Sequence, residues 1–153
     1  MTVPSASAAR KLRVIQWSTG NAGRCAVRGI VRHPRPKLVG LPSHSPDKQG
    51  RDAAELAGLD APTGVLATND ADALLAMDAD CVCYTAQGET RIRETVEDLS
   101  RILRAGKNVV NTSIVSLCYP PFASPKLRET LEQACADGGT TLYTSGFDPG
   151  WSG

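Results

Sequence analysis

The sequence has few aromatic residues, no excess charge of either sign and no long apolar run. Aromatic side chains make up 5% of its 153 residues, and 17 basic residues stand against 16 acidic ones. A net charge of +1 gives no global field that would attract nucleic acid or an anionic membrane, so we expect neither partner. The apolar runs are too short to cross a bilayer. This composition is still compatible with a small-molecule ligand.

Histidine is scarce, and the cysteines follow no pairing pattern. The two histidines, His33 and His44, lie in early loops, which disfavours an enzyme with a cysteine nucleophile. The five cysteines form an odd set without a secretory signal, and this favours reduced thiols and a cytoplasmic location. Cys81 and Cys83 alternate within one strand and have no second pair nearby. We therefore expect small core residues there and no metal site.

The stretch 12–24 (LRVIQWSTGNAGR) is predicted to be a buried strand that runs through a glycine turn into a helix. It matches a GxGxxG pattern, with Ser18 in place of the first glycine. Gly20 would let the backbone approach a pyrophosphate, and Gly23 would let the helix pack closely against its strand. Amides at the helix start would face the phosphates. The alternative is an ordinary tight turn. The predicted contacts are Thr19, Gly20, Asn21, Ala22 and Gly23.

Apolar periodicity and turn residues predict alternating strands and helices along the rest of the chain. The further strands are predicted at 37–41, 63–67, 80–84, 107–112 and 140–144. The further helices are predicted at 52–56, after Asn69 or Asp70, from Ile92 to Gly106, and from Ser124 to Gly138. This order predicts an α/β fold, a doubly wound, mostly parallel Rossmann sheet of about six strands with helices on both faces.

The loop 42–51 follows the second strand, where such folds hold the adenosine ribose of a dinucleotide. NAD-binding domains usually place an acid at this point, but no acid ends this strand. Asp47 remains available to a ribose. In the alternative interpretation the loop is only a solvated turn, in which Ser45 caps a short helix that begins at Pro46. The loop's hydroxyls and cations favour NADP(H), and NAD(H) is the alternative. These hydroxyls and cations belong to Ser43, Ser45, Lys48 and Arg51.

Two further segments fall at the predicted carboxyl edge of the sheet. Thr85 and Gln87 follow the strand 80–84 and are candidate ribose contacts, because ligands of open α/β sheets bind at this edge. The connection 112–122 is long for a compact α/β unit. Loops at this edge often carry function, whereas the apolar residues of this one also fit simple packing.

The chain divides into three expected segments. Residues 1–11 are a disordered tail, 12–145 an NAD(P)-binding Rossmann domain, and 146–153 a hinge into a C-terminal substrate domain that is missing. Asp148 is the candidate residue at that junction. We expect a homo-oligomer only together with the missing domain. The sequence leaves open whether the chain is a fragment or a natural stand-alone domain.

Three motifs together resemble one family. VIQWSTGNAGR (14–24), SPDKQGRD (45–52) and GFDPG (146–150) resemble the N-terminal domain of the dihydrodipicolinate reductase-like superfamily, above all actinobacterial members related to 2,4-diaminopentanoate dehydrogenase. The resemblance covers the chain from Leu12 onward. It implies that the glycine turn binds a pyrophosphate and that Ser45 and Lys48 bind the adenosine ribose.

The same resemblance implies an NAD(P)H-dependent oxidoreductase that transfers a hydride to or from a C=N or C–NH2 carbon of a small-molecule substrate. The histidine pair and lysine of true dihydrodipicolinate reductases are absent, so lysine biosynthesis is one option and an amine or imine substrate is equally compatible. Catalytic residues stay unassigned. The alternative is a non-catalytic nucleotide- or CoA-binding Rossmann module.

Overall fold

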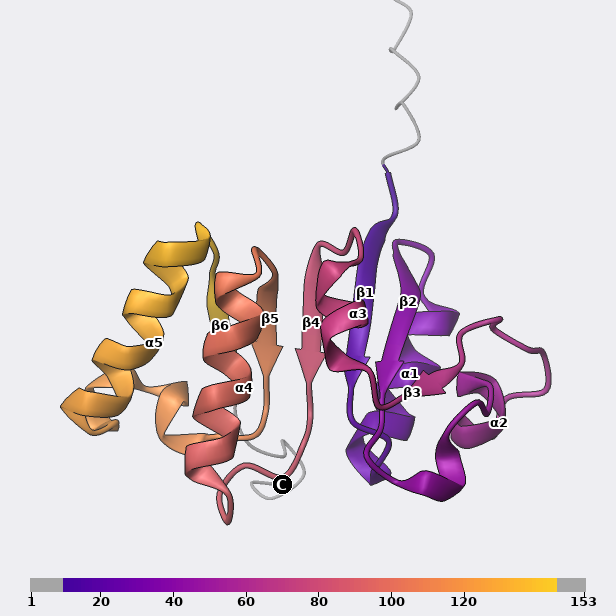
Figure 1. Ribbon diagram of the computed structural model, residues 1–153, viewed down its shortest axis with the longest axis horizontal. Coiled ribbons are helices and arrows are strands. Elements are labelled where there is room, and N and C mark those ends of the chain that lie inside the picture. The colour runs from indigo at the N-terminus through magenta and orange to yellow at the C-terminus, as the bar shows by residue number, and fades with distance from the viewer. Residues whose placement is uncertain (1–9, 146–153) are drawn as a thin grey trace, which may run out of the picture.

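Strands and helices alternate along residues 10–145, the part of the chain that the computed structural model describes (Figure 1). The strands are β1 (Leu12–Trp17), β2 (Pro36–Pro42), β3 (Ala67–Thr68), β4 (Cys81–Tyr84), β5 (Asn108–Asn111) and β6 (Leu142–Thr144). The helices are α1 (Asn21–Arg32), α2 (Ala53–Ala57), α3 (Ala71–Ala76), α4 (Ile92–Arg104) and α5 (Pro125–Gly138), with short 3-10 helices η1 (Pro46–Lys48), η2 (Val115–Cys118) and η3 (Pro120–Phe122). Residues 1–9 of the expected tail, and the expected hinge 146–153 with Asp148, lie outside the described residues.

The six strands form one sheet in the order β3-β2-β1-β4-β5-β6. Every neighbouring pair is parallel, and the arrows of β1, β2, β4 and β5 point the same way in Figure 1. The chain builds outward from β1 to β3, crosses back, and continues from β4 to β6. Ligands of such sheets bind outside the carboxyl ends where the order reverses, here between β1 and β4. The predicted doubly wound Rossmann sheet is confirmed.

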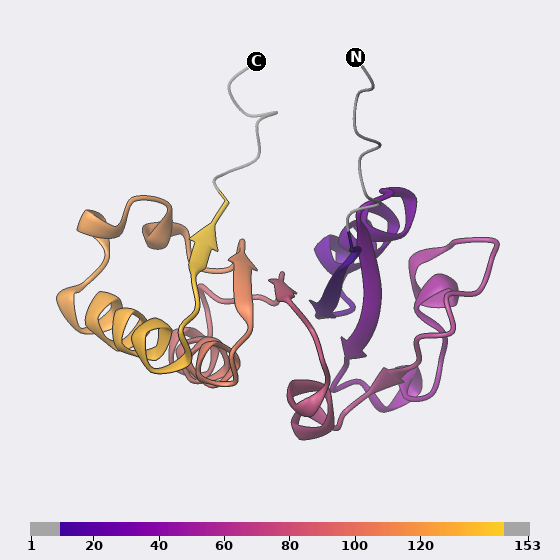
Figure 2. The ribbon, with the colours of Figure 1, turned by 90° about the horizontal axis from the view of Figure 1, so that it is seen from above.

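Helices cover both faces of the sheet, as Figure 2 shows. Helices α3, α4 and α5 pack over the larger core, which includes Ile15, Val82 and Leu99 with no exposed surface. Helices α1 and α2 enclose a smaller core around Val27 and Ala53. Because successive strand residues point to opposite faces, Ile15 of β1 faces the first core and its neighbours on either side face α1.

One row of side chains runs across the α1 face of the sheet from a covered to an uncovered position. Gln16, Cys83, Val110 and Tyr143 are register partners on β1, β4, β5 and β6. Gln16 has no exposed surface, Cys83 is half-buried, and Val110 and Tyr143 are 38% and 62% exposed. Within residues 10–145, this face of β5 and β6 therefore carries no helix (Figure 2).

The third strand is shorter and later than predicted. Instead of spanning 63–67, β3 holds only Ala67 and Thr68. The Asp52 carboxylate caps α2 at the Ala54 amide and also accepts hydrogen bonds from the Thr63 amide and hydroxyl and the Gly64 amide. These bonds draw 63–64 into a turn, in which Gly64 adopts a φ of 75° that favours glycine. The prediction of a strand over 63–67 was wrong for this reason.

The long connection after β5 is folded rather than open. It contains η2 and η3, and it buries Ile114, Leu117 and Ala123 in the larger core. Tyr119 and Phe122 pair on its surface with ring centroids 5.3 Å apart. Packing therefore accounts for Ile114, Leu117 and Ala123, whereas Tyr119 and Phe122 are 59% and 81% exposed.

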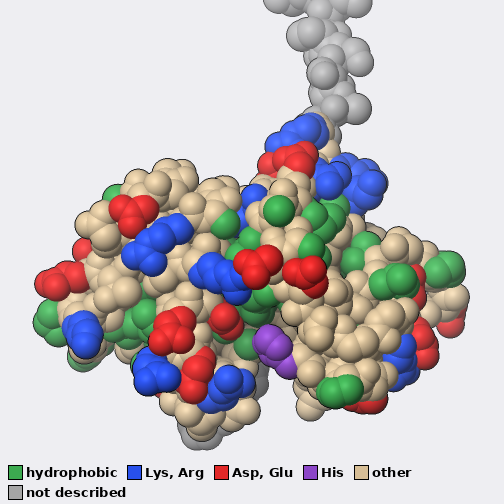
Figure 3. All heavy atoms as spheres, in the orientation of Figure 1, with side chains coloured by type: hydrophobic (Ala, Val, Ile, Leu, Met, Phe, Trp, Pro, Cys, Tyr) green, Lys and Arg blue, Asp and Glu red, His purple; other side chains and the backbone are tan. Residues whose placement is uncertain are grey.

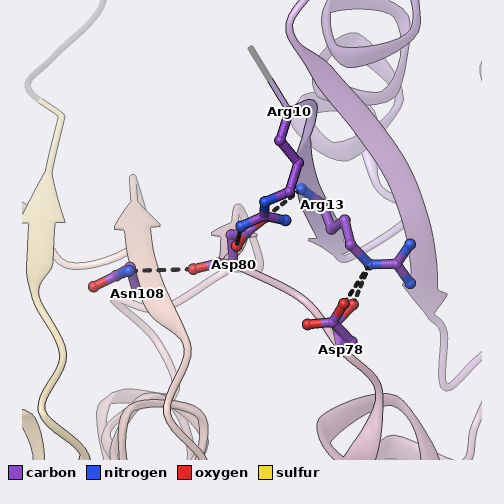
Figure 4. A network of polar contacts seen from close by, with 5 residues as sticks. All are labelled: Arg10, Arg13, Asp78, Asp80 and Asn108. Atoms are coloured by element: carbon purple, nitrogen blue, oxygen red, sulfur yellow. Dashed lines mark hydrogen bonds and ion pairs between the residues drawn. The ribbon is translucent and has the colours of Figure 1, made fainter.

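A polar network closes the amino edge of the sheet (Figure 4). The Asp80 carboxylate accepts a forked pair of hydrogen bonds from the Arg10 guanidinium and a 2.7 Å bond from the Arg13 amide. Arg13 also forms an ion pair with Asp78. The side-chain amide of Asn108 donates to the backbone carbonyl of Asp80 at 3.2 Å. Asp80 thereby joins β1 to β5 and begins no strand of its own, so β4 starts one residue later than predicted.

Within 10–145 no group of three or more histidines, cysteines and acids could hold a metal ion. All five cysteines are free thiols. Over the same residues, no helix combines the length and the apolar character needed to traverse a bilayer.

Candidate ligand-binding site

The turn between β1 and α1 presents a helix N-terminus at the point where the strand order reverses. Gly20 is the N-cap of α1, and no side chain caps the helix. No acidic residue lies in its first turn. The first amides of a helix have no partner within it, and the helix dipole favours an anion there. The turn therefore suits a phosphate-sized anion.

The two glycines of this turn serve different purposes. A Cβ placed on Gly23 would overlap the backbone carbonyl of Ser18, so only glycine allows α1 to approach the strand end so closely. A Cβ placed on Gly20 would meet only the Ser18 hydroxyl, at 4.0 Å, and would otherwise stand in open space. Gly23 is thus needed by the fold, whereas the space beside Gly20 is free for a ligand.

Ser18 takes the backbone conformation of the glycine that it replaces. Its φ is 116°, in the region that favours glycine. Its hydroxyl lies 3.4 Å from both the carbonyl and the hydroxyl oxygen of Thr85. The Thr85 hydroxyl accepts a 2.7 Å hydrogen bond from the side chain of Gln16. Thr85 was predicted to contact a ribose, but it does not line the cavity described below.

The loop after β2 is fastened to the glycine turn. Lys48 Nζ donates to both the carbonyl and the hydroxyl of Thr19, at 3.2 Å each. The Thr19 hydroxyl lies 3.1 Å from that of Ser43, and Gln49 donates to the carbonyls of Ser43 and Ser45. Ser45 precedes η1 but its side chain makes no capping bond, so its hydroxyl is not used in that way.

A cavity of about 580 Å³ opens between this loop, the glycine turn and α4. Six of the residues singled out from the sequence line it: Thr19, Gly20, Ser43, Ser45, Lys48 and Gln87. Asn21, Ala22, Gly23 and Thr85 do not, although Asn21 lines the second hollow described below. Trp17 and Tyr84 form part of the lining and stack with ring centroids 6.2 Å apart.

The far wall of the cavity comes from α4, and sequence reasoning did not anticipate it. Its lining residues are Arg91, Glu94, Thr95, Glu97 and Asp98. Asp98 accepts a 3.0 Å hydrogen bond from the Tyr84 hydroxyl. Burial, and then the Asp98 carboxylate, raise the pKa of Tyr84 above its usual range, so the phenol stays neutral. Acidic and basic side chains are interspersed on the molecular face in Figure 3, in agreement with the near-zero net charge.

A second hollow of about 350 Å³ lies on the other side of the glycine turn. Three cations line it, Arg24, Lys48 and Arg51, together with Asn21 and Glu55. Arg24 donates to the Asn21 side chain at 2.6 Å, and Arg51 forms an ion pair with Glu55 at 2.9 Å. Arg24 was not among the predicted cofactor contacts. Its position one residue after the last glycine was the available signal.

The loops that follow β4 and β5 lie against each other at the same edge. A Cβ on Gly88 would overlap the Ser113 carbonyl, and the Ser113 hydroxyl donates to the Ala86 carbonyl. Glu89 accepts a 2.6 Å hydrogen bond from the Val115 amide. These contacts fix the segment that carries Gln87 into the cavity.

Known proteins that are similar in sequence to this chain include an amine dehydrogenase and a reductase. An amine dehydrogenase from Streptomyces virginiae is 40% identical over 140 residues, which are 92% of this chain and 39% of that protein. A 4-hydroxy-tetrahydrodipicolinate reductase from Trichormus variabilis is 39% identical over 62 residues, which are 40% of this chain and 22% of that protein. The chain thus spans about two fifths or less of the length of these relatives. No protein-family profile matches it.

Solved structures share the fold. An amine dehydrogenase from Mycobacterium smegmatis superposes with a TM-score of 0.76 at 27% identity, over 88% of this chain and 39% of that one. A biliverdin reductase from Synechocystis, solved with biliverdin and NADP+, superposes with a TM-score of 0.65 at 21% identity, over 88% of this chain and 37% of that one.

Proposed function

Because the chain belongs to the dihydrodipicolinate reductase-like superfamily of NAD(P)-binding Rossmann domains, we propose that it binds a nicotinamide dinucleotide across the carboxyl ends of β1 and β4. The observation that carries the proposal is the uncapped α1 N-terminus beside the open space at Gly20, next to the 580 Å³ cavity. Amides of the turn at Gly20, Asn21 and Ala22 would hold the pyrophosphate.

We further propose that the chain prefers NADP(H) to NAD(H). An acid that accepts from the ribose 2′-hydroxyl is typical of NAD-binding domains, and β2 ends at Pro42 without one. The hollow lined by Arg24, Lys48 and Arg51 offers three cations where a 2′-phosphate would lie. Guanidinium groups match phosphate oxygens in geometry as well as in charge. Ser45 would contact the same ribose from the η1 loop.

The amine dehydrogenases of Streptomyces virginiae and Mycobacterium smegmatis, which match 92% and 88% of this chain, support a proposal for the reaction class. We propose an oxidoreductase that acts on a C=N or C–NH2 carbon of a small molecule. The nicotinamide, when bound, supplies or accepts the hydride. This chain's own residues bind and orient it: Gln87 lies in the cavity wall, on a segment fixed by Gly88 and Ser113. We also propose a cytoplasmic location, and a homo-oligomer that forms only together with a C-terminal substrate domain.

Calorimetry with NADPH and NADH tests the binding site. Gly20→Val should abolish binding, because the valine side chain would fill the space beside the turn. The φ of −74° at this position accepts any residue, so the variant should still fold. Gly29→Val is the matched control, since a Cβ on Gly29 also meets open space but lies within α1, outside both hollows. Equal NADPH affinity in the parent and in folded Gly20→Val would refute the site.

Lys48→Ala and Arg24→Ala test the cofactor preference. Each should weaken NADPH more than NADH, by about tenfold in the ratio of the two affinities, as expected for one lost charged hydrogen bond. An unchanged ratio would remove these cations from the 2′-phosphate. If CoA or ADP bound as tightly as NADPH, and bound NADPH gave no change in nicotinamide fluorescence, a nucleotide-binding module without redox function would replace the proposal.

A further inference from the structure

Gln16 is a buried polar residue in the middle of the sheet, and its burial is not explained by packing. Its neighbours in β1, Ile15 and Trp17, are apolar and buried in the larger core. Gln16 has no exposed surface, yet its Oε1 atom lacks a hydrogen-bond partner among the described residues. A buried amide oxygen without a partner costs free energy that an apolar side chain of the same shape would not.

The Gln16 amide nitrogen connects the ends of the two strands between which the strand order reverses. Its Nε2 atom donates to the Thr85 hydroxyl at 2.7 Å, at the end of β4. The same atom lies 3.4 Å from the Ser18 carbonyl oxygen, at the end of β1. The Ser18 hydroxyl in turn lies 3.4 Å from two oxygens of Thr85. Gln16, Ser18 and Thr85 form one polar cluster directly behind the glycine turn.

The Ser18 carbonyl is held from two sides. On one side stands Gln16, and on the other stands Gly23, where a Cβ would overlap this carbonyl. Between them Ser18 keeps a φ of 116°, which is strained for a non-glycine residue and persists only where the surroundings impose it. The direction of this carbonyl sets the course of the chain into Thr19 and Gly20.

We propose that Gln16 is a positioning residue for the cofactor-binding turn. Through the Ser18 carbonyl and the Thr85 hydroxyl it holds the turn in the geometry that receives the pyrophosphate, at a cost in stability. This inference rests on the proposed function. It also gives Thr85 a role in supporting the turn instead of the direct ribose contact predicted from the sequence.

The first test compares Gln16→Met with the parent for thermal stability and for NADP+ affinity. Methionine fills a similar volume and removes the unpartnered oxygen, so the melting temperature should stay the same or rise. The NADP+ dissociation constant should increase about fivefold, the equivalent of one ordinary hydrogen bond. If Gln16 were merely structural, the substitution would lower both the melting temperature and the affinity for NADP+. Unchanged affinity in a folded Gln16→Met would overturn the proposal.

A second variant keeps the test decisive if methionine disturbs the fold. In Gln16→Glu the protonated carboxyl can donate to the Thr85 hydroxyl, whereas the ionised carboxylate cannot. Burial raises the pKa of such a carboxyl. Affinity for NADP+, relative to the parent at the same pH, should therefore be near normal at about pH 5.5 and reduced at about pH 8. A ratio independent of pH would contradict the donor role.

A double-mutant cycle with Ser18→Gly shows whether Gln16 acts through the strained backbone. Glycine adopts this φ without strain, so the loss of affinity caused by Gln16→Met should become smaller in the Ser18→Gly background. Additive effects would mean that Gln16 does not act through Ser18. Failure of the parent to bind NADP+, or unchanged binding in Gly20→Val, would instead refute the proposed function.

Discussion

Replacing Ser18 by glycine should make the domain more stable, although it removes a side chain that makes contacts. A non-glycine residue in a sparsely populated backbone region costs about 1–3 kcal/mol, and Ser18 has a φ of 116°. Glycine removes that strain. Against this, glycine adds entropy to the unfolded chain, worth about 0.4–1 kcal/mol.

The contacts that Ser18→Gly loses are weak. Among residues 10–145, the hydroxyl of Ser18 has two neighbours in hydrogen-bond range. Both are oxygens of Thr85 at 3.4 Å, which is long for a bond between oxygens. The net gain should therefore be about 0.5–2 kcal/mol. For a domain of this size that corresponds to a rise in melting temperature of about 2–6 °C.

Thermal denaturation followed by circular dichroism measures this change, and Ser18→Ala is the control. Alanine loses the hydroxyl but keeps the Cβ and therefore the strain, so it should melt at or slightly below the parent. Glycine should melt above both. If the glycine variant melts at or below the alanine variant, the backbone of Ser18 is not strained and the reasoning fails.

Three further outcomes are expected. Gly23→Ala should lower the stability by more than about 3 kcal/mol in urea unfolding, because the new methyl overlaps the Ser18 carbonyl; a loss below 1 kcal/mol would contradict the close approach. The Arg10 guanidinium, followed by the Arg13 amide, holds the pKa of Asp80 below its usual range. The Asp80 carboxylate therefore stabilises the fold above about pH 4, and this stabilisation disappears as the pH falls through the lower pKa of the folded state. In Asp80→Asn the unfolding free energy should fall less steeply with decreasing pH than in the parent. Burial raises the pKa of the Cys83 thiol to about 11, with a further contribution from the neighbouring Cys81 thiol, so at pH 8 a disulfide reagent should modify it much more slowly than an exposed cysteine of the same chain, and equal rates would refute its burial.

The parts of the fold that depend on local chemistry could be predicted from the sequence. The strand 12–17 and the helix that follows Gly20 agree with the structure because apolar spacing and a glycine turn act over a few residues. The strand 63–67 could not be predicted, because the Asp52 side chain reaches eleven and twelve positions along the chain to capture Thr63 and Gly64. Such a long-range hydrogen bond leaves no periodic signal.

The candidate site shows the same division. Thr19, Gly20, Ser45, Lys48 and Gln87 were predicted and lie together in one cavity, since each follows the end of a strand and parallel strands end at one edge. The acidic wall from α4 escaped prediction because a polar helix face looks the same whether it meets solvent or a cavity. Whether these residues contact a cofactor stays a prediction until binding is measured.

The Asp80 network and the glycine turn lie at opposite ends of β1, which holds six residues and so separates them by about 20 Å. Substitutions this far apart, with no shared partners, act independently on stability. The loops of the proposed ligand-binding site can therefore vary without weakening the Asp80 network that joins β1, β4 and β5. We therefore expect that substitutions around Lys48, the proposed contact of the 2′-phosphate, leave the strands held in register by Arg10, Asp80 and Asn108.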